Sequence, residues 1–112
     1  MNKSLRFYMS STDTYEHKSV YEIIARDAKE YGLSGATVYR GAMGFGKSSE
    51  LHSDKFWEFV IKQPIIVEII DDDKQLYSFM EKERKMLDLI PKGFIVTMQD
   101  IDIIYQKSGI EK

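Results

Sequence analysis

The residues with the strongest chemical pattern run from Gly41 to Ser48 and read Gly-Ala-Met-Gly-Phe-Gly-Lys-Ser. This spacing matches the P-loop pattern, in which backbone N–H groups surround phosphates, the lysine contacts phosphate oxygens and the hydroxyl ligates Mg²⁺. Asp71, which follows the apolar run Ile65–Ile70, imitates the acidic residue of a second nucleotide-binding motif. The context contradicts a P-loop, because the residues after Ser48 open a helix poorly and the chain contains too few strong helices to cover both faces of a parallel sheet.

Two interpretations of the glycine segment therefore remain open. In the first, it is a hairpin connection whose glycines supply backbone conformations with positive φ. In the second, it is a flexible loop that binds phosphate without being a P-loop, with Arg40 and Lys47 at its base. Lys47 also fits a solvated loop charge, and Arg40 also fits a surface ion pair with Glu68.

Other side chains near this segment have residue types suited to binding. Phe45 lies between two glycines, where it either anchors the loop or contacts a partner or a base. Histidine is the residue type whose ordinary pKa lies near neutral pH, and His52 fits either a functional role or a hydrogen-bonded structural role. His17, with Asp13 and Glu16, has the residue types of a metal site, but no regular element gives these residues ligand spacing, so we expect no metal.

Composition and charge exclude several classes of protein. The chain has 112 residues, 43% hydrophobic and 30% charged, which is typical of one globular domain spanning residues 1–112. Its net charge of −2 does not favour nucleic acid as a partner, and the absence of cysteine excludes disulfides and a cysteine nucleophile. No signal peptide is visible, and no apolar run approaches the roughly 20 residues of a membrane span, so we expect a cytoplasmic protein.

The hydrophobic pattern predicts alternating strands and helices. A period of two predicts a strand over Lys3–Met9, and Ser10–Lys18 is polar and predicts a loop. Ser19 and Glu22 form a capping box that predicts the start of a helix, which Gly32 ends. We then expect a strand over Thr37–Met43, an ambiguous segment Ser48–Phe59 and a strand Pro64–Ile70 that is buried on both faces. A second helix is expected between Asp71–Asp73 and Pro91, and the residues on its apolar stripe are Leu76, Phe79, Met80, Glu83, Leu87 and Ile90. Two strands, Phe94–Met98 and Ile101–Tyr105, and a loose tail 106–112 complete the expected order.

This order predicts an α+β fold of the ferredoxin-like kind. We expect a βαββαβ sandwich with an extra C-terminal strand, in which an antiparallel sheet carries both helices on one face. The other face keeps mixed apolar surface, contributed by Arg6, Tyr8 and the strand Pro64–Ile70. Oligomerisation through that face is the simplest way to cover it.

Four segments together resemble a known family. They are the run Arg40-Gly41-x-x-Gly44-Phe45-Gly46 followed by His52, the stretch Asp13…Lys18-x-x-Tyr21-Glu22, the turn Tyr31-Gly-Leu-x-Gly-Ala-Thr-Val38, and the strand Pro64–Asp71. Over residues 5 to 105 the chain resembles the PII-like family of unknown function (domain of unknown function one-ninety). The resemblance implies a ferredoxin-like fold, a homotrimer akin to the PII signalling proteins, and no established reaction.

The resemblance also implies where a ligand would bind. PII relatives bind adenine nucleotides between subunits and use the loop after the second strand as a movable effector, which here is Gly41–Ser53. They place a phosphate-contacting loop at Lys92-Gly93, which otherwise fits a turn after Pro91. The segment Gln99-Asp-Ile-Asp102 is acidic where PII proteins have a basic pair, which favours a smaller phosphate load.

The sequence thus predicts a binding module, since no nucleophile–base pair and no paired catalytic carboxylates are visible. It would bind a small anionic ligand, an adenine nucleotide, and would signal to a protein target such as a membrane transporter or an enzyme, with no metal and no cofactor. The candidate ligand-binding residues are Arg40, Gly41, Gly44, Phe45, Gly46, Lys47, His52, Lys92 and Gly93. The alternatives are an oligomeric interaction subunit without a ligand and a weak nucleotide phosphohydrolase.

Overall fold

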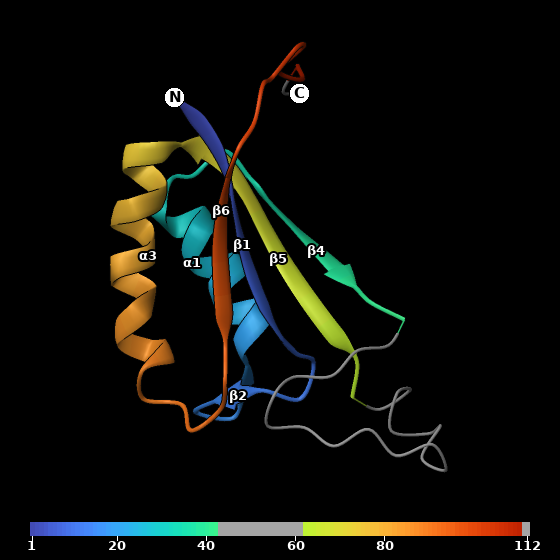
Figure 1. Ribbon diagram of the computed structural model, residues 1–112, viewed down its shortest axis with the longest axis vertical. Coiled ribbons are helices and arrows are strands. Elements are labelled where there is room, and N and C mark those ends of the chain that lie inside the picture. The colour runs from blue at the N-terminus through green and yellow to red at the C-terminus, as the bar shows by residue number, and fades with distance from the viewer. Residues whose placement is uncertain (43–61, 111–112) are drawn as a thin grey trace.

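An antiparallel sheet of four strands carries both helices on one face in the computed structural model, which describes residues 1–42 and 62–110 (Figure 1). The strands lie in the order β4-β5-β1-β6. This order, with both helices on one face, confirms the expected ferredoxin-like class. In chain order the elements are β1 (Asn2–Ser10), β2 (Thr14–Tyr15), β3 (Lys18–Ser19), α1 (Val20–Tyr31), β4 (Ala36–Arg40), β5 (Pro64–Asp72), α3 (Asp73–Leu87) and β6 (Ile95–Asp100).

The core lies between the sheet and the two helices. Alternate residues of the central strands point into it, because successive side chains of a strand face opposite ways. Phe7 of β1 pairs with Val67 of β5, and both are buried. Phe79 of α3 packs edge-on against Phe7 with ring centroids 6.3 Å apart. The buried side chains from the strands are Leu5, Phe7, Met9, Ile65, Val67 and Ile69, and those from the helices are Val20, Ile24, Ala28, Leu76, Phe79 and Leu87.

The expectation that Pro64–Ile70 is buried on both faces is wrong for the single chain. Burial alternates along β5, where Ile65 is 1% exposed and Ile70 is 40% exposed. The physical reason is that both helices cover the same face of the sheet (Figure 1). No helix of the described residues covers the other face.

The start of α1 differs from the expected capping box. Ser19 is the N-cap residue, but its side chain makes no capping hydrogen bond. The segment expected to be a loop instead forms the small β2–β3 hairpin, which brings the carbonyl of Asp13 within 2.9 Å of the backbone N–H of Val20. The carbonyl of Asp13 thus accepts a hydrogen bond from one of the backbone N–H groups at the start of the helix that have no partner within the helix. Gly32 ends the helix with φ +92°, as its position predicts.

Within the acidic run Asp71–Asp73, the residue that caps α3 with its side chain is Asp72. The Asp72 carboxylate accepts from the backbone N–H of Lys74 at 3.2 Å, which confirms a helix start here. Asp71 belongs to β5, and its carboxylate accepts from the backbone N–H and the hydroxyl of Ser34, at 2.8 and 2.9 Å. Burial raises the pKa of Asp71, but these hydrogen bonds outweigh it and hold the pKa below its ordinary value.

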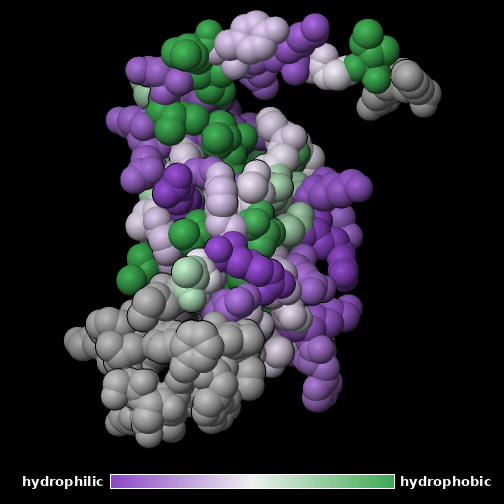
Figure 2. Space-filling model, turned by 90° about the vertical axis from the view of Figure 1, so that its right-hand side faces the viewer, coloured by the Kyte–Doolittle hydropathy of each residue, from purple (hydrophilic) through white to green (hydrophobic). Residues whose placement is uncertain are grey.

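The predicted extra C-terminal strand is absent from the described residues. Strand β6 runs through Gln99-Asp100, where a break was expected, and residues 101–110 form no strand. In Figures 1 and 2 the end of the chain stands clear of the body. Ile104 is 95% exposed and Tyr105 77% exposed, and this β-forming segment pairs with no strand of residues 1–42 and 62–110.

No helix in the described part of the chain is both long enough and apolar enough to cross a membrane. The predicted location in the cytoplasm stays a prediction. The ambiguous segment Ser48–Phe59 lies outside the described residues.

Candidate functional site

Arg40 ends strand β4 on the face of the sheet that carries the helices. It pairs across the β4–β5 ladder with the core residue Ile65, and directly paired residues point to the same face. Its Nη2 donates to the hydroxyl of Tyr21 at 3.0 Å, and its Nη1 donates to Oε1 of Gln63 at 3.3 Å. The guanidinium carbon also lies 5.4 Å from the centroid of the Tyr21 ring. Uncharged groups from α1 and from the residue before β5 thus fix the position of the Arg40 side chain.

The alternative pairing of Arg40 with Glu68 is wrong. Glu68 pairs with Thr37 in the ladder, three residues from Arg40, so the two side chains lie on opposite faces of the sheet. The Glu68 carboxylate instead accepts from Arg6 and Ser4, both at 2.8 Å. Within residues 1–42 and 62–110, no carboxylate lies within ion-pair distance of the Arg40 guanidinium.

Gly41 and Pro64 meet where β4 ends and β5 begins. The backbone N–H of Gly41 donates to the carbonyl of Pro64 at 2.8 Å. A Cβ atom at position 41 would lie only 2.7 Å from Cγ of Pro64, so the close approach of the two strands requires a glycine there. The other predicted loop residues, Gly44, Phe45, Gly46, Lys47 and His52, lie outside the described residues.

Lys92 and Gly93 lie at the same end of the sheet as Arg40 but at its other edge. The β4 strand ends where β6 begins, because β4 runs parallel to β1, and β6 runs antiparallel to β1. Two strands separate β4 from β6, which at ordinary strand spacing is roughly 14 Å between their axes. One chain therefore does not bring Arg40 and Lys92 together on a single small anion.

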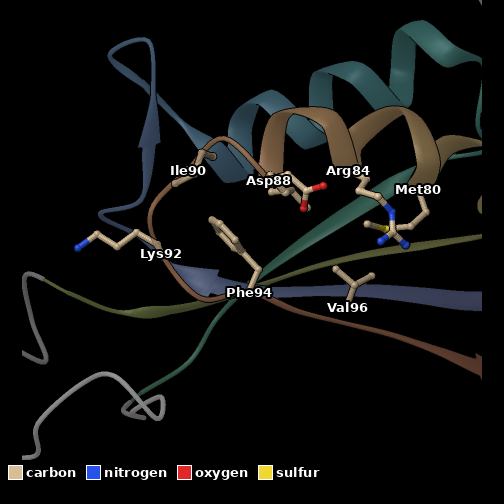
Figure 3. A pocket seen from close by; sticks show the side chains of 8 residues that line it. Met80, Arg84, Asp88, Ile90, Lys92, Phe94 and Val96 are labelled. Carbon is tan, nitrogen blue, oxygen red and sulfur yellow. The ribbon is translucent and has the colours of Figure 1, made fainter.

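A cavity of about 360 Å³ lies beside Lys92, between the end of α3 and the start of β6. Figure 3 shows Arg84 and Met80 entering it from α3, and Phe94 lying below the loop that carries Ile90. Its lining residues are Met80, Arg84, Leu87, Asp88, Ile90, Lys92, Phe94 and Val96. The cavity thus combines apolar walls with two cations and one carboxylate.

Sequence reasoning missed Arg84 as a candidate. Its position in the last turn of α3 gave it an ordinary role, since cations favour helix C-termini. Its exposed ion pair with Glu81, 3.4 Å between Nη2 and Oε1, is weak at such a surface and leaves the guanidinium available. The missing signal was the cavity that residues of α3 and β6 line together, which only the three-dimensional fold shows.

His17 lies in the turn of the β2–β3 hairpin, where it and Glu16 have φ of 68° and 50°. Positive φ at both central residues is typical of the tight turns that join antiparallel strands. The described residues contain no group of three or more His, Cys, Asp or Glu side chains that could hold a metal ion.

Comparisons with known proteins place this chain among uncharacterised relatives. The model of the DUF190 family, described as Uncharacterized ACR, matches residues 2–103. A UPF0166 protein of Aquifex aeolicus (strain VF5) is 33% identical over 103 residues, which cover 92% of this chain and 93% of that protein.

Solved structures show the same fold. The structure of CPII, a nitrogen regulatory PII-like protein from Thiomonas intermedia K12, bound to ADP, AMP and bicarbonate, has a TM-score of 0.62 at 14% identity and covers 95% of this chain and 96% of that one. A second structure of CPII, bound to ADP, AMP and acetate, has a TM-score of 0.60 at 14% identity and covers 91% and 87% of the two chains. At this level of identity the likeness shows the fold alone.

Proposed function

Because this chain belongs to the DUF190 family and has a PII-like fold, we propose that it is a regulatory protein that binds a small anionic ligand, an adenine nucleotide, between subunits. The observation that carries the proposal is the state of Arg40. Its guanidinium is held in place by Tyr21 and Gln63, and no carboxylate of the described residues neutralises it.

An arginine in this state is suited to an anion. The guanidinium stays charged at every physiological pH and presents a rigid fork of N–H groups that fits two phosphate oxygens at once. Its contacts with Tyr21 and Gln63 reduce the side-chain freedom that ligand binding would otherwise have to remove.

The position of Lys92 supports a ligand between copies of the chain. Arg40 and Lys92 lie at the same end of the sheet but at opposite edges. A closed ring of copies repeats one head-to-tail contact, so it can bring the β4 edge of one copy beside the β6 edge of the next. In a trimer of this kind one phosphate group can contact Arg40 of one copy and Lys92 of its neighbour.

Two observations support an adenine nucleotide with few phosphates. The Thiomonas protein, which shares the fold, was solved bound to ADP and AMP. In this chain β6 ends at Asp100, whose carboxylate pairs with the Lys3 ammonium group at 3.2 Å, so this strand end offers no free positive charge from that pair. AMP or ADP therefore suits the charges of this chain better than ATP does.

The loop Gly41–Ser53 would report the ligand to a protein target. A nucleotide at Arg40 lies at the root of this loop, beside the hydrogen bond between Gly41 and Pro64. Ligand contacts at the root can select among conformations of the segment that follows, to the extent that the ligand binds one of them better.

Calorimetry with AMP, ADP and ATP tests the proposal. We expect Arg40→Ala to weaken the wild-type affinity at least tenfold, because a charge-assisted hydrogen bond contributes about 1.5–3 kcal/mol. Arg40→Lys should recover only part of the loss, since lysine lacks the fork of donors. Arg26→Ala, which removes an exposed arginine of α1, is the matched control and should bind as the wild type does.

An unchanged affinity in Arg40→Ala, with the oligomer intact, would place the ligand elsewhere. A wild-type protein that binds none of the three nucleotides at millimolar concentration would favour an interaction subunit without a ligand.

A further inference from the structure

Glu83 of α3 is a buried carboxylic acid whose oxygen atoms lack a full set of partners. Its residue is 2% exposed, and its Oε1 atom has no hydrogen-bond partner among the described residues. A buried carboxylate without compensation is costly, because burial removes the water that stabilises its charge. Nothing in the proposed function uses this group.

The surroundings of Glu83 form a groove between the helices. The groove has a volume of about 340 Å³ and is lined by Tyr15, Ile23, Asp27, Lys82, Glu83, Lys85, Met86 and Leu89. Asp27 faces Glu83 from α1, Tyr15 approaches from β2, and the charged neighbours on α3 itself are Lys82 and Lys85. The carboxyl group therefore faces a second carboxyl group in a mainly apolar groove.

Two facing carboxyl groups in such a place do not both ionise, because like charges repel most strongly where water is excluded. Burial and the facing Asp27 together raise the pKa of Glu83 to about 8, although the charge of Lys82 opposes them. The ammonium group of Lys82 also lies 5.7 Å from the centroid of the Tyr31 ring, so it has an aromatic contact on α1 as well.

We propose that Asp27 and Glu83 form a proton-binding site between α1 and α3, and that loss of its proton opens the groove between these helices. With the proton bound, the two carboxyl groups share it in a hydrogen bond and the helices pack closely. Without it, two facing negative charges separate or admit water. The fold thus contains a device that couples the packing of its helical layer to pH.

Helix α3 links the proposed proton-binding site to the cavity on the other side of the helix. Arg84 follows Glu83 directly, and Leu87 lies one turn further along the same helix. Both residues line the cavity beside Lys92. Figure 3 labels Arg84 among the side chains there. Because a helix of this length moves as a unit, a shift of α3 away from α1 also changes the shape of this cavity.

Methionine methyl groups offer probes on both sides of α3. Met86 lines the groove, Met80 lines the cavity, and Met9 is buried in the core and serves as an internal reference. With ¹³C-methyl methionine in the whole chain, we expect the Met86 resonance to shift during a titration from weakly acidic to alkaline pH, with its midpoint near the Glu83 pKa of about 8. We expect a smaller shift at Met80 and the smallest at Met9.

Variants identify the group that titrates. Glu83→Gln keeps the shape of the side chain but cannot lose a proton, so it should abolish the shift of Met86. Asp27→Asn should lower the midpoint, because it removes the facing charge. Glu30→Gln, which changes an exposed carboxylate of α1, is the matched control and should titrate as the wild type does.

A direct reading of the wild-type carboxyl group completes the test. The ¹³C resonance of the Glu83 carboxyl carbon should titrate with the same midpoint as Met86. A Met86 resonance that stays constant in the wild type, or that shifts equally in Glu83→Gln, overturns the proposal. A Glu83 carboxyl group that ionises at the ordinary value of 4.5 overturns it as well.

Discussion

The guanidinium of Arg40 donates a hydrogen bond of 3.0 Å to the hydroxyl of Tyr21, while its central carbon lies 5.4 Å from the centroid of the same ring. This contact ties the last residue of the edge strand β4 to the first turn of α1. The end of β4, where the segment Gly41–Ser53 begins, is therefore fixed to the helical layer as well as to the sheet. The same contact is what orders the candidate ligand-binding cation.

Tyr21→Phe should weaken nucleotide binding by roughly two- to tenfold, because it removes one hydrogen bond and leaves the aromatic face in place. Calorimetry with AMP measures the effect. Tyr77→Phe is the control, since Tyr77 is 56% exposed on α3 and lies away from Arg40. An equal affinity in wild type and Tyr21→Phe would mean that the hydroxyl does not help to position the guanidinium.

Glu68→Gln should destabilise the protein at neutral pH. The Glu68 carboxylate accepts from Ser4, Arg6 and Tyr39, at 2.8, 2.8 and 2.9 Å. Burial raises the pKa of Glu68, but these hydrogen bonds and the charge of Arg6 outweigh it, so the pKa lies below its ordinary value of 4.5. Loss of the charge should lower the free energy of unfolding by about 1–3 kcal/mol.

The pH dependence of this effect has a definite sign. A lowered pKa in the folded state stabilises the protein above the unfolded value, and this stability is lost as pH falls through the folded value. The difference between wild type and Glu68→Gln should therefore shrink in acid. Urea unfolding at neutral pH and below the ordinary pKa of 4.5 measures it, and a difference that is the same at both pH values would contradict the prediction.

The contribution of Glu83 to stability should depend on pH in the opposite direction to that of Glu68, and Glu83→Gln tests this. The folded pKa of Glu83, about 8, lies above its ordinary value of 4.5, so the folded state binds the extra proton between these values. Wild-type stability is highest at the acidic end and should fall, relative to the variant, by up to about 1.4 kcal/mol per pH unit as pH rises through this window. Above the folded pKa the contribution is lost completely.

Chemical unfolding of wild type and Glu83→Gln at several pH values measures this slope. Parallel stability curves for the two proteins would show that Glu83 does not carry its proton in the folded state. Glu30→Gln again serves as the exposed control on α1.

Several local features were predictable from the sequence because short stretches determine them. The alternation in β1, the glycine that ends α1 and the aspartate that caps α3 depend on neighbouring residues alone. The helical stripe expected from the sequence includes Glu83 together with Leu76 and Phe79, and the structure buries all three side chains. A charged residue on such a stripe is the signal in the sequence for the proton-binding site that we propose.

Features that depend on distant residues were not predictable in the same way. Whether Arg40 meets Glu68 depends on the register of β4 and β5, which puts the two side chains on opposite faces. The carbonyl of Asp13 replaces the expected Ser19 cap because the β2–β3 hairpin folds back onto α1. The Ile101–Tyr105 segment has the residues of a strand, but in the described part of the chain it pairs with no other strand.

We predict that the protein is a homotrimer of about 39 kDa, three times 13.1 kDa. Strand β4 is exposed along its whole length, and Ile104, Tyr105 and Ile110 are 95%, 77% and 91% exposed, so single copies leave apolar surface uncovered. Light scattering at micromolar concentration measures the mass. A monomer under these conditions would contradict the prediction.

Removal of the residues after Asp100 should weaken this assembly, because burying one isoleucine side chain contributes about 1.5–3 kcal/mol. A chain shortened only after Ser108 keeps Ile103, Ile104 and Tyr105 and is the matched control. Equal dissociation of the two shortened proteins on dilution would show that these three side chains take no part in assembly.

Gly41→Ala should lower the free energy of unfolding by about 1–3 kcal/mol, since the added methyl group would lie 2.7 Å from the Pro64 ring. Gly35→Ala is the matched control, because a Cβ there meets no atom within 4 Å. Thermal unfolding of both variants measures the difference. A Gly41→Ala protein as stable as Gly35→Ala would mean that β4 and β5 separate at this point at no cost.

The hydrogen bond between Gly41 and Pro64 also bears on how proteins of this fold can diverge. Since the ladder and this bond already hold the two strand ends together, the sheet does not depend on the length of the chain that joins them. Doubling a flexible connection costs only about 0.6 kcal/mol of closure entropy. We therefore expect insertions, deletions or a grafted sequence between Gly41 and Pro64 to leave the paired ends of β4 and β5 in place.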